Sequence, residues 1–223
     1  SRRQRQMCIR DRYYAIPGAQ LYSPTNYNQD RFLGPVIVRV ALANSLNIPA
    51  VRILEKVGVD NFLNRLHQLG FRHLQASPEY YGLGLSLGSG EVSLWELAKA
   101  YLILAKKGEV IPIITTISPQ TSPTFQAELT ENLPRRKNQN IPPLPKAKSE
   151  WMLITDILSD THARATEFGV NSALNLPFPA AVKTGTSSDF RDTWTVGFTK
   201  DYTVGVWVGN FSGKSMMPIS GIM

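Results

Sequence analysis

The sequence predicts an α+β fold in which a helical lobe precedes a small antiparallel sheet. Between residues 35 and 108, apolar side chains recur at helical spacing and are bounded by capping residues and glycines. Residues 180–209 instead hold three short runs rich in valine, threonine and aromatic residues, which is typical of strands. With 223 residues, 43% of them hydrophobic, the chain is long enough to bury a sizeable core, and we expect one domain.

Three short helices are expected in succession, over residues 35–43, 49–58 and 60–70. Pro35 suits the first turn of a helix, because its missing N–H group has no partner there in any case. Pro49 opens the second helix for the same reason, and Asp60 is the expected cap of the third. Ser45 then falls in the turn between the first two helices.

A fourth helix, over residues 94–106, has the clearest start signal in the chain. Ser93 and Glu96 have the spacing of a capping box, in which each side chain bonds the other residue's backbone N–H. The glycine-rich stretch at residues 82–90 precedes it. Its spacing is not that of a phosphate-binding loop, so we interpret it as a tight connection.

Residues 115–148 differ from the rest of the chain, with six prolines among serine, threonine, asparagine and glutamine. We interpret them as a flexible surface insertion or as a linker between two lobes. A helix restarts at Ser149. Strands are then predicted over residues 180–186, 193–199 and 203–209, the last two joined as a hairpin.

The formal net charge of +7 would suggest an anionic partner such as nucleic acid. However, residues 1–12 contain five arginines against one aspartate and account for more than half of that charge. The charge on the remaining residues is small for their number. We therefore expect no nucleic-acid partner.

The same twelve residues have an unusual origin in our interpretation. The string Met7-Cys8-Ile9-Arg10-Asp11-Arg12 can be encoded by ATG TGT ATA AGA GAC AGN, which resembles the end of a transposon-derived sequencing adapter. We expect residues 1–12 to be a non-native tail and residues 13–223 to be a partial domain. The alternative is a genuine basic tail.

Cysteine and histidine usage argues against a metal or cofactor. Cys8 is the only cysteine, so neither a disulfide framework nor a thiolate metal site is available. His67, His73 and His162 lack ligand spacing and are expected at the surface or in caps. No apolar run reaches the length of a membrane span. No metal site and no cofactor are expected.

Two short motifs carry the chemistry. Lys183-Thr184-Gly185-Thr186 leads into the predicted hairpin, and Ser45-Leu46-Asn47 leads into a helix. K-T-G and S-x-N, together with S-x-x-K, form the active-site set of penicillin-binding proteins and β-lactamases. The third motif is missing, because no serine in the sequence is followed three residues later by lysine.

Longer strings extend the match. The segments ALANSLNIPAVRILEKVG, GLGLSLGSGEVSLWELAKAY and FPAAVKTGTSSDFRDTWTVGFTKDYTVGVWVGN resemble the transpeptidase domain of bifunctional class A penicillin-binding proteins, most closely the 1C branch. The resemblance covers about residues 13–114 and 149–223 and leaves the insertion unmatched. It implies an incomplete β-lactamase/transpeptidase-like fold and a D,D-transpeptidase that cross-links peptidoglycan through an acyl-serine intermediate.

The resemblance also implies what accompanies this domain. Its partners would be peptidoglycan stem peptides ending in D-Ala-D-Ala and β-lactam antibiotics. The S-x-x-K nucleophile, a glycosyltransferase domain and a membrane anchor would lie upstream of this sequence. The domain would face the periplasm from the bacterial inner membrane. Without its nucleophile, the 223-residue chain alone is expected to be inactive.

The resemblance assigns a role to each motif residue. Ser45 would relay a proton between the S-x-x-K lysine and the leaving nitrogen. Asn47, whose amide both donates and accepts, would hold that lysine and the substrate backbone. Lys183 would supply a fixed positive charge that attracts the substrate and orients Ser45.

The rest of the second motif would contact the substrate directly. Thr184 would bond the terminal carboxylate of the peptide, and Gly185 would leave room for a strand-like substrate. Thr186 would contribute its backbone N–H to the oxyanion hole, and its hydroxyl would also reach the carboxylate.

Two other functions share this fold. A β-lactamase or D,D-carboxypeptidase would hydrolyse the acyl-enzyme, but no glutamate here begins the E-x-x-L-N string with which class A β-lactamases activate water. A non-catalytic β-lactam-sensing domain is the other alternative. It predicts that the native upstream sequence lacks the S-x-x-K pair.

Overall fold

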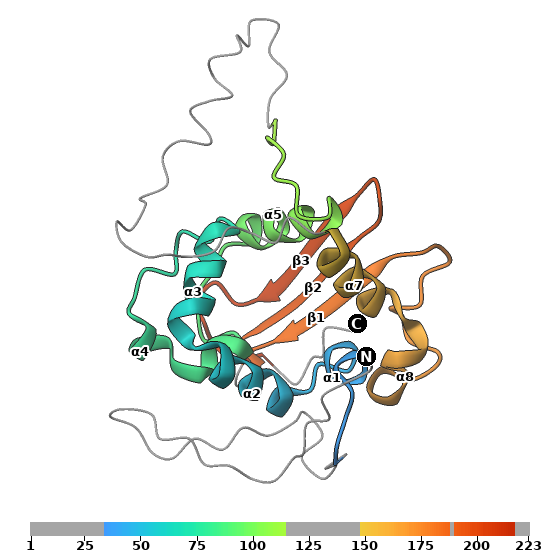
Figure 1. Cartoon of the computed structure of the whole chain (residues 1–223), viewed down its shortest axis with the longest axis horizontal. Helices are drawn as coiled ribbons and strands as arrows, with labels where there is room; N and C mark the ends of the chain where they lie inside the picture. The colour runs from blue at the N-terminus through green and yellow to red at the C-terminus, as the bar shows by residue number, and fades with distance from the viewer. Residues whose placement is uncertain (1–33, 115–147, 188–189, 217–223) are drawn as a thin grey trace, which may run out of the picture.

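The computed structural model describes residues 34–114, 148–187 and 190–216, drawn in colour in Figure 1. The expected tail at residues 1–12 lies outside the described residues. So does the insertion, apart from its last residue, Lys148, which begins a helix instead.

The sheet has three antiparallel strands in the order β1-β2-β3. Their bounds are Ala181–Thr186 for β1, Asp192–Phe198 for β2 and Thr203–Gly209 for β3. In this register Lys183 lies opposite Val196 and Gly185 lies opposite Trp194. The predicted α+β class, with an antiparallel sheet following a helical lobe, is confirmed.

Seven α-helices and one 3₁₀ helix accompany the sheet in the described parts of the chain. They are α1 (Val38–Ala43), α2 (Asn47–Val57), α3 (Val59–Gln68), α4 (Pro78–Tyr81), the 3₁₀ helix η1 (Gly82–Leu87), α5 (Leu94–Ala105), α7 (Lys148–Ser159) and α8 (Thr161–Phe168).

The starts of α1, α2 and α3 differ from the predictions. α1 starts three residues after Pro35, and α2 starts at Asn47, so that Pro49 lies within its first turn, where a missing N–H is tolerated. α3 follows Gly58 directly, so Asp60 lies in its first turn and does not cap it. There its negative charge still complements the positive end of the helix dipole.

The capping box of α5 is confirmed, and its glutamate also binds the preceding segment. The backbone N–H of Glu96 donates to Ser93 Oγ over 3.1 Å, and Ser93 N–H donates to Glu96 Oε2 over 3.2 Å. Glu96 Oε1 accepts the N–H of Arg72 over 2.6 Å, and His73 Nδ1 pairs with Glu96 Oε2 over 2.8 Å. Glu96 is therefore buried with its carboxylate satisfied, and it ties the start of α5 to the segment after α3.

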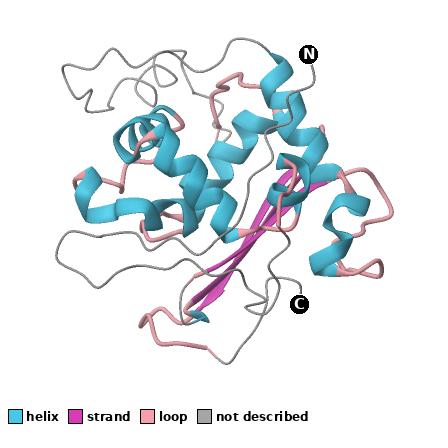
Figure 2. Cartoon of the chain, turned by 60° about the horizontal axis from the view of Figure 1, so that its bottom comes forward, coloured by secondary structure: helices cyan, strands magenta, loops and turns pink. Residues whose placement is uncertain are grey.

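The helices pack mainly on one face of the sheet (Figures 1 and 2). A first core cluster lies among α2, α3, η1 and α5, and consists of Leu54, Leu63, Phe71, Leu74, Tyr81 and Leu85. A second cluster joins α7 to the sheet through Leu158, Ala181 and Phe198. On β3, Val204, Val206 and Val208 point away from the helices and are exposed.

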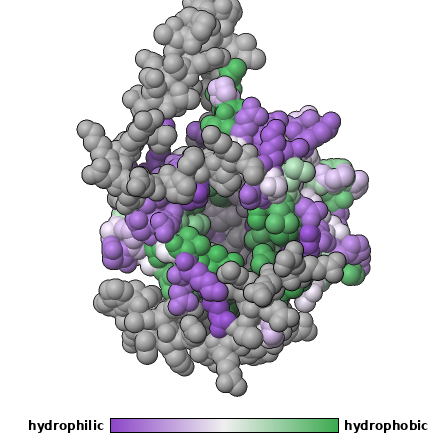
Figure 3. Space-filling model, in the orientation of Figure 1, coloured by the Kyte–Doolittle hydropathy of each residue, from purple (hydrophilic) through white to green (hydrophobic). Residues whose placement is uncertain are grey.

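In Figure 3 the face seen in Figure 1 is hollowed over the sheet, with hydrophobic residues around the hollow. No helix within the described ranges is long and apolar enough to cross a membrane. Among those residues there is also no cluster of histidine, cysteine, aspartate and glutamate suited to a metal ion.

Candidate active site

The two sequence motifs meet in space, although they lie 138 residues apart. Lys183 is the third residue of β1, and Ser45 lies in the turn between α1 and α2. Lys183 Nζ donates a hydrogen bond to Ser45 Oγ and a second, of 2.7 Å, to the carbonyl oxygen of Thr184. The fold thus places a cation and a hydroxyl side by side, as proton relay requires.

Burial changes the acid–base properties of Lys183. Removing its ammonium from water disfavours the charged form and lowers its pKa from 10.5 to about 8. Lys183 is therefore still mostly cationic near neutral pH, but it releases its proton more easily than a surface lysine.

A strained turn presents Ser45. Its φ angle is +54°, which non-glycine residues seldom adopt and which concentrates at functional sites. Backbone bonds from Ser45 N–H to Leu42 O (3.2 Å) and from Leu46 N–H to Ala41 O (3.0 Å) close the turn. Leu46 is buried against Val36 and Ala41, so the residue after Ser45 anchors the turn in the core.

Asn47 occupies the first position of α2 and is half-buried. It is not among the described residues that line the cleft beside Lys183. The structure therefore places Asn47 close to Ser45 in the chain but not on the wall that carries the K-T-G motif.

A cleft of about 360 Å³ runs beside β1. Lys183, Thr184, Gly185 and Thr186 all line one wall, followed by Ser187. Residues 87–92 and Tyr101 of α5 also line the cleft. The glycine-rich stretch that we interpreted as a tight connection thus forms η1 and then a wall of the candidate site.

Gly185 is not required by the packing of the chain itself. A Cβ atom placed there would meet only the Cβ of Trp194, at an ordinary van der Waals distance of 3.6 Å. In contrast, a Cβ on Gly90, which also lines the cleft, would come within 2.5 Å of Leu74. Glycine at position 185 therefore leaves space in the cleft, whereas glycine at position 90 allows the wall to pack.

A side-chain cluster fixes the far end of this strand. The Asp192 carboxylate accepts the indole N–H of Trp207 over 2.8 Å and the hydroxyl of Ser187 over 3.0 Å. Ser187 Oγ in turn accepts the N–H of Asp192 over 2.8 Å. These bonds hold the chain just after Thr186, and no local sequence signal predicts them.

On the other side of Lys183 lies a small hollow of about 10 Å³, lined in part by Ser45 and Arg164. Arg164 is 3% exposed, and its Nη2 donates to Leu158 O over 2.9 Å. Asn44, the residue before Ser45, is 2% exposed. Neither residue was predicted from the sequence. Arg164 lines this hollow together with Lys183 and Ser45, and Asn44 adjoins Ser45 in the chain.

The lowered pKa of Lys183 predicts a pH dependence of stability. Between pH 8 and 10.5 the unfolded chain keeps the Lys183 proton while the folded chain loses it, so stability should rise with pH across this window. Below pH 8 the lysine is charged in both states, and the cost of burying the ammonium is fully present. Each unit of pKa difference corresponds to about 1.4 kcal/mol.

The measurement is the denaturant midpoint as a function of pH, compared between the native chain and Lys183→Met. Because other lysines and tyrosines also titrate in this window, the difference between the two proteins is the informative quantity. The stability of Lys183→Met minus that of the native chain should decrease from pH 8 to pH 10.5, because only the native chain gains stability from the Lys183 titration. A difference that stays constant would contradict the lowered pKa.

Comparisons with known proteins match the chain to the family whose motifs meet at this site. The family model described as "Penicillin binding protein transpeptidase domain" matches residues 5–216. That match begins within residues 1–12, the segment interpreted as a non-native tail. Penicillin-binding protein 1A of Aquifex aeolicus is 32% identical over 211 residues, which are 92% of this chain and 26% of that protein. Penicillin-binding protein 1C of Escherichia coli is 30% identical, over 88% of this chain and 22% of that protein.

The chain thus spans about a quarter of the length of the curated relatives it matches. Among solved structures, penicillin-binding protein 1A from Haemophilus influenzae superposes with a TM-score of 0.70 at 20% identity. The superposition covers 97% of this chain and 36% of that one, and it supports the fold.

Proposed function

The chain belongs to the family of penicillin-binding protein transpeptidase domains, and from this we propose that it forms the substrate-binding part of a serine D,D-transpeptidase whose S-x-x-K nucleophile lies outside these 223 residues. The observation that carries the proposal is the contact between Lys183 and Ser45 at the edge of a cleft lined by the rest of the K-T-G motif.

The proposed reaction is acyl transfer in two steps. The serine of the S-x-x-K pair attacks the carbonyl of the penultimate D-alanine, and the terminal D-alanine leaves with a proton on its nitrogen. An amine of a second stem peptide then takes the acyl group and releases the serine. Ser45 would relay the proton in the first step, and Lys183 would hold the Ser45 hydroxyl in place.

The cleft supports a role for each remaining motif residue. Thr184 and Thr186 would bond the substrate carboxylate, and the Thr186 backbone N–H would serve the oxyanion hole. Gly185 would let an extended substrate backbone approach β1. Asn47 would hold the S-x-x-K lysine and the substrate backbone. That lysine is not among these 223 residues, because they contain no S-x-x-K motif.

The finer parts of the proposal concern the whole protein. The class A names of its relatives support a bifunctional enzyme, with a glycosyltransferase domain and a membrane anchor preceding this domain. We infer that the domain faces the periplasm, where its substrates are peptidoglycan stem peptides and its inhibitors are β-lactams. The interpretation of residues 1–12 as a non-native tail also remains a proposal.

The test is covalent labelling by a fluorescent penicillin. The chain extended upstream through its S-x-x-K segment should give a stable fluorescent band, and the 223-residue chain alone should give none. A band that forms and is rapidly lost would instead indicate a β-lactamase or carboxypeptidase. If the extended chain folds but gives no band, catalysis is excluded and a non-catalytic domain remains.

Gly185→Val tests whether the cleft at β1 holds the substrate. A valine side chain would occupy the space beside Trp194 and should slow labelling of the extended chain by about 10- to 100-fold, a loss typical of a misplaced substrate. Because valine favours strands and no contact closer than 3.6 Å opposes its Cβ, stability should fall little. Labelling at the native rate would show that the substrate does not pass Gly185.

A further inference from the structure

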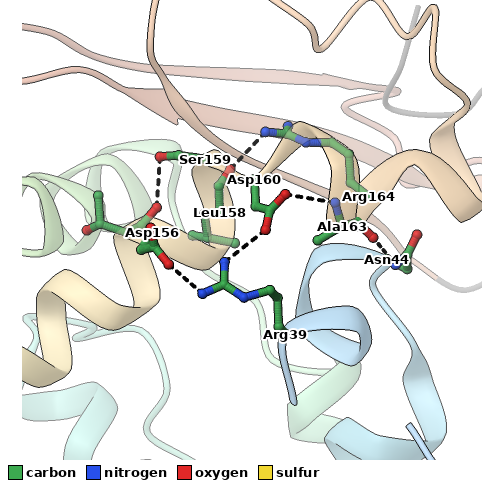
Figure 4. Close-up of polar contacts among 9 residues, drawn as sticks. Arg39, Asn44, Asp156, Leu158, Ser159, Asp160, Ala163 and Arg164 are labelled. Atoms are coloured by element: carbon green, nitrogen blue, oxygen red, sulfur yellow. Dashed lines mark hydrogen bonds and ion pairs between the residues drawn. The ribbon is translucent and has the colours of Figure 1, made fainter. Parts of the chain in front are cut away.

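Asn44 makes three hydrogen bonds with its side-chain amide, and two of them reach a helix far along the chain. Figure 4 shows the bond to Ala163. Its Nδ2 donates to Val40 O over 2.9 Å, within α1, and to Ala163 O over 2.6 Å, in α8. Its Oδ1 accepts the backbone N–H of Glu167 over 2.9 Å. At 2% exposure, this amide has exchanged water for three protein partners.

The two partners in α8 lie one helical turn apart. Asn44 therefore bonds the carbonyl group and the N–H group of a single turn of α8 with one rigid amide. This bidentate arrangement fixes both the distance and the orientation of the end of α1 relative to α8. A single hydrogen bond would fix only the distance.

The other end of α1 is joined to the same region (Figure 4). Arg39 Nη1 donates to Asp160 Oδ2 over 2.9 Å, and its Nη2 pairs with Asp156. Asp160 caps α8 by accepting the N–H of Ala163 over 2.8 Å. That backbone bond and the Arg39 guanidinium hold the pKa of Asp160 below its usual value, so the carboxylate stays charged.

These bonds matter because α1 has only six residues, too few to hold its position by its own backbone bonds. Its last residue, Ala43, is followed by Asn44 and then by Ser45, whose positive φ is unfavourable for a side chain that bears a Cβ. Such a turn persists only where its surroundings impose it. Asn44, the residue before Ser45, ties this turn to α8.

We propose that Asn44 is a positioning residue for the transpeptidase site, which holds Ser45 against Lys183 by fixing the end of α1 to α8. Its importance for acylation rests on the function proposed above, whereas its effect on the Lys183–Ser45 contact does not. Asn44 touches no substrate and acts only through Ser45.

The test variant is Asn44→Leu, which removes all three bonds with a neutral side chain of similar size. The matched control is Asn61→Leu. Asn61 Nδ2 also bonds the carbonyl oxygen four residues earlier, Val57 O at 2.9 Å, but Asn61 is exposed on α3. Both variants are made in the 223-residue chain and in the extended chain, and rates are divided by the folded fraction.

The first readout is the titration of Lys183, followed by NMR of its ¹³Cε group in the 223-residue chain and assigned with Lys183→Arg. When Ser45 moves away, water reaches the ammonium, and the lysine pKa should rise from about 8 toward its usual value in Asn44→Leu. It should stay unchanged in Asn61→Leu. This readout does not depend on catalysis.

The second readout is the acylation rate of the extended chain with fluorescent penicillin. We expect Asn44→Leu to be slower by about 10- to 100-fold, because a displacement of about 1 Å of a catalytic group has effects of this size. Asn61→Leu should react at the native rate. If Asn44→Leu does not fold, Asn44→Asp keeps the shape and the acceptor for Glu167 N–H but loses both donated bonds, and it should still slow acylation.

The outcomes separate the two proposals. A variant that is only less stable, with an unchanged Lys183 titration and an unchanged rate per folded molecule, would overturn the positioning role. If the native extended chain is never labelled while Asn44→Leu still shifts the Lys183 titration, the positioning role stands and the proposed function fails.

Discussion

Lys183→Ala is expected to slow acylation of the extended chain by about two to four orders of magnitude, the range measured for positioned acid–base and oxyanion-type groups. The variant removes the cation that bonds Ser45. The measurement is the second-order rate of labelling by fluorescent penicillin under single-turnover conditions. Lys200→Ala is the matched control, since Lys200 follows β2 in the same sheet but is 89% exposed.

The loss in Lys183→Ala should not come from unfolding. Burial of a charged ammonium opposes folding, as the lowered pKa of Lys183 records. Removing it should therefore leave the free energy of unfolding near the native value at pH 7, even though a small cavity is created. A variant that labels at the native rate would contradict the role of Lys183. A variant that no longer folds would instead show that the lysine is structural, with Lys183→Met as the check.

Local signals predicted much of the fold because they act over a few residues. The capping box at Ser93 and Glu96 and the hairpin after Phe198 each depend on contacts between near neighbours, and both are confirmed. α8 was missed, although its cap, Asp160, carries the usual local signal. Its eight residues have little apolar periodicity, and its position depends on Arg39 and Asn44, more than 100 residues away.

The residues of the candidate site also divide into those that the sequence predicted and those that it did not. The K-T-G and S-x-N motifs predicted that Lys183 and Ser45 belong to one site, and the structure brings them into contact. The stretch at residues 82–90, part of which lines the cleft, was interpreted only as a connection, because its spacing is not that of a phosphate-binding loop. Asn44 and Asp192 were missed because buried polar residues that support a site are recognised by their tertiary partners, which one sequence does not display.

Ser45→Ala should also slow acylation by about two to four orders of magnitude, because no other hydroxyl bonds Lys183 among the described residues. Ser45→Gly is the companion variant. It removes the same hydroxyl, but glycine adopts the +54° φ angle readily, so it should be more stable than Ser45→Ala by about 1 kcal/mol. Equal rates with unequal stabilities would assign the rate loss to the hydroxyl and the strain to the backbone.

The double variant Lys183→Ala/Ser45→Ala decides how the two groups act. If Lys183 serves mainly to hold Ser45, the second substitution removes little that the first has left, and the double variant should label about as slowly as the slower single variant. If the two groups contribute independently, their losses should multiply, giving about four to eight orders of magnitude. We expect the first outcome, because the buried ammonium directs one of its bonds to Ser45 Oγ and its other to the carbonyl oxygen of Thr184. Multiplying losses would instead mean that Lys183 acts on the substrate separately from Ser45.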